Sequence, residues 1–140
     1  MTLPASWAVQ VALYDLLRND AELQAVASTG VQIHDSVPDE PTYPFITVGE
    51  AKISDYPGLD GAREHDIRLH IYSKWGGRQE VRTITDLLQA RLHDAVLPLD
   101  GHRLSQCRFA FADIFRPVEA ETFHGVARFR LVTEPLTQTV

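Results

Sequence analysis

Residues 63–97 read REHDIRLHIYSKWGGRQEVRTITDLLQARLHDAVL and decide the fold class of this chain. Between Asp66 and Tyr72 apolar and polar side chains alternate, which is typical of a strand with one buried face and one face in water. Gly76-Gly77 then predicts a turn, because residues without a Cβ enter turns at little cost. Apolar residues follow at three- and four-residue spacing: Val81, Ile84, Leu87, Leu88, Leu92 and Ala95. The stretch therefore predicts a strand, a glycine turn and an amphipathic helix that pack on one another.

The same patterns extend the unit in both directions. Helices are expected over 4–18 and 21–27, and strands or extended segments over 31–34, 45–53, 103–113 and 122–133. The alternation places Glu50 on the side of Ile46 and Val48, and Phe111 on the side of Cys107 and Phe109. This order predicts an α+β fold in two layers, a mainly antiparallel sheet of about four strands with the helices packed on one face. We expect residues 1–140 to form a single domain with a loose tail over 135–140.

Composition limits the kinds of function. The chain of 140 residues carries 19 acidic and 13 basic residues and a net charge of −6, so a nucleic-acid reader with a basic surface is disfavoured. A lone cysteine excludes an internal disulfide. The N-terminus lacks the basic and apolar regions of a signal peptide, and no apolar run approaches the length of a membrane span. We therefore expect no membrane association.

The residues that could carry chemistry do not form a recognisable site. His65 and His70 are five residues apart on one strand and point to opposite faces, and the other histidines lack metal-ligand spacing. Cys107 lies mid-strand on an apolar face, where burial makes a thiol inert. No GxSxG elbow or phosphate loop is present. We predict no catalytic residue, no metal site and no cofactor.

Two groups of residues remain as candidates for contact with other molecules. Apolar and aromatic residues in predicted loops are typical of protein interfaces, or of loops that fold back on their own core. They are Tyr56, Pro57 and Leu59 in the connection 54–62, Trp75 beside the glycine turn, and Ile114, Phe115 and Pro117 in the connection 114–123. The second group is basic: Arg108, Arg128 and Arg130 could line a channel or form a solvated sheet face with Glu50 and Asp66 as counter-charges.

Five segments carry a resemblance to a known family. They are ALYDLLRNDAELQAV (12–26), VQIHDSVPDEPTYPFITVGE (31–50), EHDIRLHIYSKWGGRQEV (64–81), LPLDGHRLSQCRF (97–109) and FHGVARFRLVTEP (123–135). In their order and spacing the chain resembles the small tail-completion, or tail-terminator, proteins of long-tailed phages, prophages and gene transfer agents. The resemblance runs over roughly 7–135 and contains no catalytic motif.

The resemblance implies a structural virion protein made in the bacterial cytoplasm. Members form a ring, commonly six-fold, at the head-proximal end of the tail, without cofactor or enzymatic activity. The ring caps the tail tube, ends its elongation and offers a joining surface to the head-tail connector or stopper protein. DNA would pass through the channel without specific binding, and an acidic balance suits such a channel. Two other hypotheses stay open: a monomeric cytoplasmic module that binds a small ligand or regulator, and a hydrolase built on Cys107 or a histidine.

Overall fold

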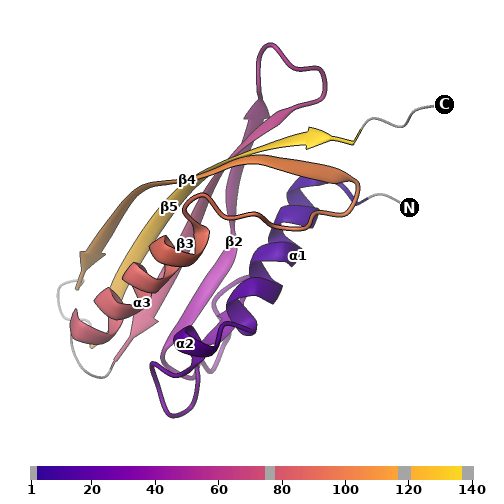
Figure 1. Cartoon of the computed structure of the whole chain (residues 1–140). Helices are drawn as coiled ribbons and strands as arrows, with labels where there is room; N and C mark the ends of the chain where they lie inside the picture. Colours follow the sequence, from indigo (N-terminus) through magenta and orange to yellow (C-terminus); the bar gives the residue numbers. More distant parts are fainter. Residues whose placement is uncertain (1–2, 75–77, 117–120, 137–140) are drawn as a thin grey trace.

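A computed structural model describes residues 3–74, 78–116 and 121–136 as two layers, a five-stranded sheet and helices on one of its faces (Figure 1). The elements are α1 (Ala5–Arg18), α2 (Ala21–Gln24), β1 (Gln32–His34), β2 (Phe45–Asp55), β3 (Arg63–Ser73), α3 (Arg78–Leu92), β4 (His102–Phe115) and β5 (Phe123–Pro135). The strand order is β1-β2-β3-β5-β4, with β1 parallel to β2 and the other neighbours antiparallel. The predicted α+β class is confirmed, and the short segment before Pro38 supplies a fifth strand.

The two long helices cover different parts of the same sheet face. Helix α1 packs on β1 and β2, and α3 packs on β3, β4 and β5. Leu13 and Leu17 of α1 and Ile84 and Leu88 of α3 are at most 2% exposed, so each helix buries the apolar stripe that its sequence predicts. Side chains of the inner sheet face complete the core, among them Ile46, Leu69, Ile71, Ala127, Phe129 and Leu131. No helix of the described residues lies on the other face of the sheet (Figure 1).

Two register shifts change which side chains reach that open face. The shift in β2 falls between Thr47 and Glu50, so Glu50 lies opposite Arg68 on the open face. The shift in β4 falls between Phe109 and Phe111, so Phe111 lies opposite Arg128. The predictions that Glu50 shares a face with Ile46, and Phe111 with Cys107, are wrong. An extra residue in a bulge reverses the alternation beyond it.

Several element bounds also differ from those expected. Asp20 caps α2, accepting a hydrogen bond from the Leu23 N–H at 3.0 Å, and the helix expected over 21–27 ends at Gln24. Strand β4 continues to Phe115, so Ile114 and Phe115 belong to a strand and not to a loop. The predicted turn at Gly76-Gly77 lies outside the described residues. Across the ranges that are described, no helix has the length and apolarity needed to cross a membrane.

Candidate assembly surfaces

The connection between β2 and β3 forms a narrow arm that projects past the neighbouring strands (Figure 1). Its backbone is closed by a hydrogen bond from the Tyr56 N–H to the Ala62 carbonyl at 3.1 Å and by another from the Ala62 N–H to the Leu59 carbonyl at 3.2 Å. Gly58 and Gly61 have φ values of 96° and 78°, which glycine adopts without strain. The arm is therefore an ordered hairpin end.

The arm presents apolar side chains to its surroundings. Leu59 is 47% exposed, Pro57 is exposed, and Tyr56 is half-buried. Beyond the three residues that β1 pairs, every residue of β2 from Gly49 to Asp55 is exposed. The interface candidates Tyr56, Pro57 and Leu59 therefore lie on a projecting arm. The part of β2 that leads into this arm is not paired with β1.

Ile114 and Phe115, which were expected in the second loop, lie in β4 and point to opposite faces of the sheet. Ile114 lies opposite Gly125 and packs against the core, whereas Phe115 lies opposite His124 on the open face and is 41% exposed. The two ring centroids of Phe115 and His124 are 4.8 Å apart. Only Phe115 of this pair is therefore available for contact. Trp75 and Pro117 lie outside the described residues.

The basic candidates gather on the open face of β4 and β5. Arg108 lies directly opposite Arg130, and Arg128 lies opposite Arg68 across the neighbouring ladder. Arg128 forms a bidentate ion pair with Asp66. Hydrogen bonding from the Arg128 guanidinium is the main cause that lowers the pKa of the Asp66 carboxyl. Glu50 accepts from Arg68 at 3.1 Å. The counter-charges predicted for this face, Glu50 and Asp66, are both in place, and Arg128 is neutralised within the chain.

The sequence did not predict that two histidines meet on this face. His70 Nε2 lies 2.5 Å from Glu50 Oε2, and His70 Nδ1 lies 3.0 Å from His124 Nε2. The hydrogen bond from His70 lowers the pKa of Glu50, and burial followed by the charge of His70 lowers the pKa of His124. His70 and His124 are 54 residues apart in the sequence, and only the β3–β5 register could have placed them together.

An aromatic row continues this network across the sheet. The rings of Phe45 and Tyr72 stack at 4.6 Å, and those of Tyr72 and His124 stack at 4.5 Å. Phe115 extends the row at the β4 end. Neighbouring rings on adjacent strands stabilise a sheet face, and we read the row as packing that holds one end of the open face rigid.

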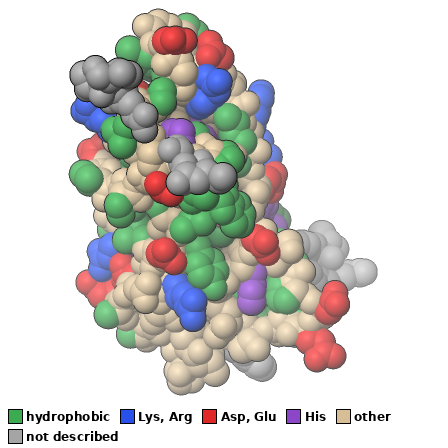
Figure 2. Space-filling view, turned by 90° about the vertical axis from the view of Figure 1, so that its right-hand side faces the viewer, with side chains coloured by type: hydrophobic (Ala, Val, Ile, Leu, Met, Phe, Trp, Pro, Cys, Tyr) green, Lys and Arg blue, Asp and Glu red, His purple; other side chains and the backbone are tan. Residues whose placement is uncertain are grey.

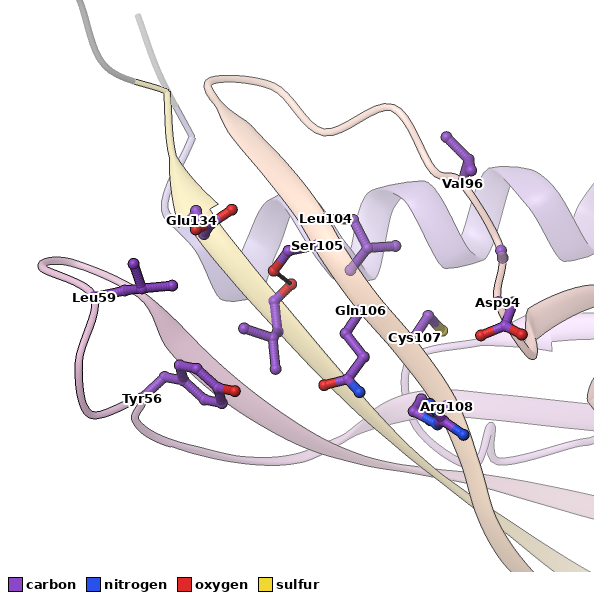
Figure 3. A pocket seen from close by; sticks show the side chains of 12 residues that line it. Tyr56, Leu59, Asp94, Val96, Leu104, Ser105, Gln106, Cys107, Arg108 and Glu134 are labelled. Carbon is purple, nitrogen blue, oxygen red and sulfur yellow. Dashed lines mark hydrogen bonds between the residues drawn. The ribbon is translucent and has the colours of Figure 1, made fainter.

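A hollow of about 510 Å³ straddles the edge strand β4 (Figure 3). Tyr56 and Leu59 of the arm lie on one side of it, and Asp94 and Val96, which follow α3, lie on the other. Cys107 is 2% exposed, and burial raises the pKa of its thiol to about 12, so little of the nucleophilic thiolate forms at neutral pH. Within the described ranges, no group of three His, Cys, Asp or Glu side chains could hold a metal ion.

These features describe a small α+β protein whose candidate functional elements are surfaces for other macromolecules. Residues 11–134 match the family described as tail completion protein gp17. Because the match spans most of the chain, the chain belongs to this family, and it is a structural protein of phage-type tails. The resemblance seen in the sequence is confirmed.

A solved structure supports the assignment. The chain is similar to one in the structure described as virion of native gene transfer agent (GTA) particle, with 25% sequence identity and a TM-score of 0.82. The alignment covers 95% of this chain and 99% of that chain, so the two share their whole fold. No match was found among curated proteins.

Proposed function

We propose that the chain is a tail terminator, a subunit that forms a ring on the tail tube once the tube has reached its length. The observation that carries this proposal is the match to the tail completion family over residues 11–134. The likeness to a chain of a gene transfer agent virion supports a place in a virion or phage-like particle. The ring, six-fold by the family resemblance, blocks further tube subunits and binds the head-tail connector or stopper protein.

In this role the whole chain acts as one domain and needs no cofactor or catalytic step. Identical subunits form a closed ring when two different surfaces of each copy meet its neighbours. The arm with Tyr56, Pro57 and Leu59, together with Phe115 at the end of β4, supplies apolar contact elements at the margins of the sheet. Trp75 and Pro117 stay interface candidates on the basis of sequence.

The open sheet face suits a surface past which DNA moves. Its ion pairs, Arg68 with Glu50 and Arg128 with Asp66, neutralise charge within the chain, and the whole chain carries a net charge of −6. Charges that are paired within the chain attract phosphates only weakly. Arg108 and Arg130, which form no ion pair with the described residues, lie at the β4–β5 end of this face.

The test is to produce particles in cells with and without the chain and to measure tails by electron microscopy. Without it, we expect tails of uneven or excessive length that carry no heads, and the wild-type chain should restore both properties. Particles with uniform, head-joined tails in its absence would overturn the proposal. Negative-stain images and solution mass of the purified chain then report whether the ring forms alone or only on the tube.

A further inference from the structure

Exposed apolar side chains gather at the two opposite edges of the sheet. Trp7, Val11 and Val37 lie at the β1 edge, with Trp7 50% and Val37 54% exposed. At the β4 edge lie Phe111, 43% exposed, and Phe115. The other large exposed apolar residues of the described chain are Ile53 in β2, Leu59 on the arm, Val96 after α3, and Leu136. Seen from the side of α1, hydrophobic side chains form a continuous group in the middle of the surface (Figure 2).

The β1-edge surface combines a hollow with unpaired acids. The hollow of about 370 Å³ lies between α1 and β1 and is lined by Trp7, Val11 and Tyr14, with Asp35 at its margin. Asp39 and Glu40 follow in the same exposed loop. No ion pair within the described residues neutralises Asp35, Asp39 or Glu40. This surface is therefore acidic and partly apolar, and it attracts a partner with a basic and apolar surface.

The β4-edge surface has the opposite character. Arg108 and Arg130 line a hollow of about 280 Å³ together with Tyr56, Gln106 and Glu64. Neither guanidinium forms an ion pair with Glu64 or with any other described residue. Like charges directly opposite each other on neighbouring strands repel. A carboxylate from outside would relieve that repulsion, and Phe111 beside it offers an apolar contact.

The backbone of β4 is partly closed to strand addition. The Asp94 N–H donates to the Cys107 carbonyl at 2.8 Å, and the Phe109 N–H donates to His93 Nδ1 at 3.1 Å. These bonds occupy backbone groups in the middle of the edge and block edge-to-edge pairing there. A partner at this edge is therefore recognised through side chains.

We propose that the β4-edge surface of one copy binds the β1-edge surface of the next copy. Arg108 and Arg130 meet the acidic loop that contains Asp35, Asp39 and Glu40, and Phe111 faces the hollow lined by Trp7. The two surfaces lie at opposite ends of the strand order, so each copy offers both and the contact runs head to tail. This inference rests on the proposed ring and names the surfaces that close it.

Cysteine cross-linking inside assembled particles tests the contact. Val37→Cys and Ala110→Cys place thiols on the two exposed surfaces, and buried Cys107 does not compete. Particles that contain both variants should give a mixed disulfide dimer on oxidation, and particles with either variant alone should give monomer. A chain that is present in length-controlled particles but gives no mixed dimer, or gives equal dimers from single variants, overturns the inference. That result leaves the proposed function standing, because tail length and head joining are measured on the same particles.

Charge reversal gives a second, independent readout. Arg108→Glu with Arg130→Glu should lower the yield of complete particles at least tenfold, and so should Asp39→Arg with Glu40→Arg. A chain that carries all four changes restores opposite charges and should regain at least half the yield. Arg82→Glu and Asp86→Lys, exposed on α3 away from both surfaces, are the matched controls and should leave the yield unchanged. A fourfold variant no better than the worse twofold variant overturns the inference.

Discussion

A Cβ atom on Gly49 would lie 2.1 Å from the carbonyl oxygen of Asp35, so the loop after β1 lies directly against the register shift of β2. No side chain fits there without moving backbone. We expect Gly49→Ala to lower the free energy of unfolding by about 3 kcal/mol or more. Overpacking typically costs roughly 1–3 kcal/mol. Gly58→Ala is the comparison, because nothing lies within 4 Å of its Cβ and only its left-handed φ adds strain. If urea unfolding shows a smaller loss of stability for Gly49→Ala than for Gly58→Ala, the close approach of Gly49 to Asp35 is contradicted.

Buried His65 should make stability depend on pH. Its ring accepts or donates a 2.9 Å hydrogen bond with Thr133, and burial lowers its pKa to about 4 from the ordinary 6.5. Between these values the unfolded chain binds more protons, so stability should fall as pH drops from about 6.5 to 4, by about 3 kcal/mol at most for this group. His65→Gln, which cannot titrate, should flatten the slope of unfolding free energy against pH in that window. An unchanged slope would assign the acid sensitivity to other groups.

The Asp66–Arg128 pair should be strongly coupled. Their side chains are 14% and 27% exposed, and the guanidinium also lies 5.5 Å from the Phe111 ring centroid. A double-mutant cycle with Asp66→Asn and Arg128→Gln should give a coupling of roughly 1.5–3 kcal/mol, typical of hydrogen bonds to charged groups. The Arg63–Asp55 pair, 45% and 76% exposed, is the control and should give well under 1 kcal/mol. Equal coupling energies for the two pairs would mean that partial burial does not strengthen the Asp66–Arg128 ion pair.

The Cys107 thiol should react only when the chain unfolds. With its pKa raised to about 12 by burial, little thiolate forms at neutral pH. A thiol reagent should modify the native chain at least a hundredfold more slowly than the chain in urea. Cys107→Ala should keep tail completion intact. Fast labelling under native conditions, or lost particle assembly in a folded Cys107→Ala chain, would reopen a chemical role.

Adjacent residues at the end of β4 should behave differently on substitution. Phe115→Asp changes an exposed ring on the open face, so the chain should fold and fail in tail joining. Ile114→Asp places a charge against the core and should destabilise the fold itself. Circular dichroism separates folding from assembly, and electron microscopy counts joined tails.

A double variant and a control variant test whether the arm is a contact surface. Tyr56→Asp with Leu59→Asp should leave thermal unfolding close to wild type, because Leu59 is 47% exposed, and should abolish head joining. Gln89→Asp on the exposed side of α3 serves as the control. Complete infectious or transducing particles from the arm variant would remove the arm from the interface.

The sequence predicts those elements whose periodicity is uninterrupted. The strand around Leu69 and the helix around Leu88 follow directly from spacing, and both are buried as expected. Glu50 and Phe111 were assigned to the wrong faces because a bulge reverses alternation without leaving a pattern in the residues themselves. The Glu50–His70–His124 network was missed for a different reason. It depends on the pairing of β3 with β2 and β5, which is a property of the sheet and not of any one segment.

The strand order also sets a sequence of events in folding. Strands β2–β3 and β4–β5 are each joined by short connections, so each hairpin forms from local contacts. Their union requires β3 to find β5, whose paired residues Arg63 and Thr133 lie far apart in the chain. Long-range pairing of this kind is expected to be slower than the formation of either hairpin. Substitutions in the β3–β5 seam, such as Leu69→Ala, should therefore slow folding, whereas changes in β1 should mainly speed unfolding. We therefore expect the two hairpins to form first and to join along the β3–β5 seam.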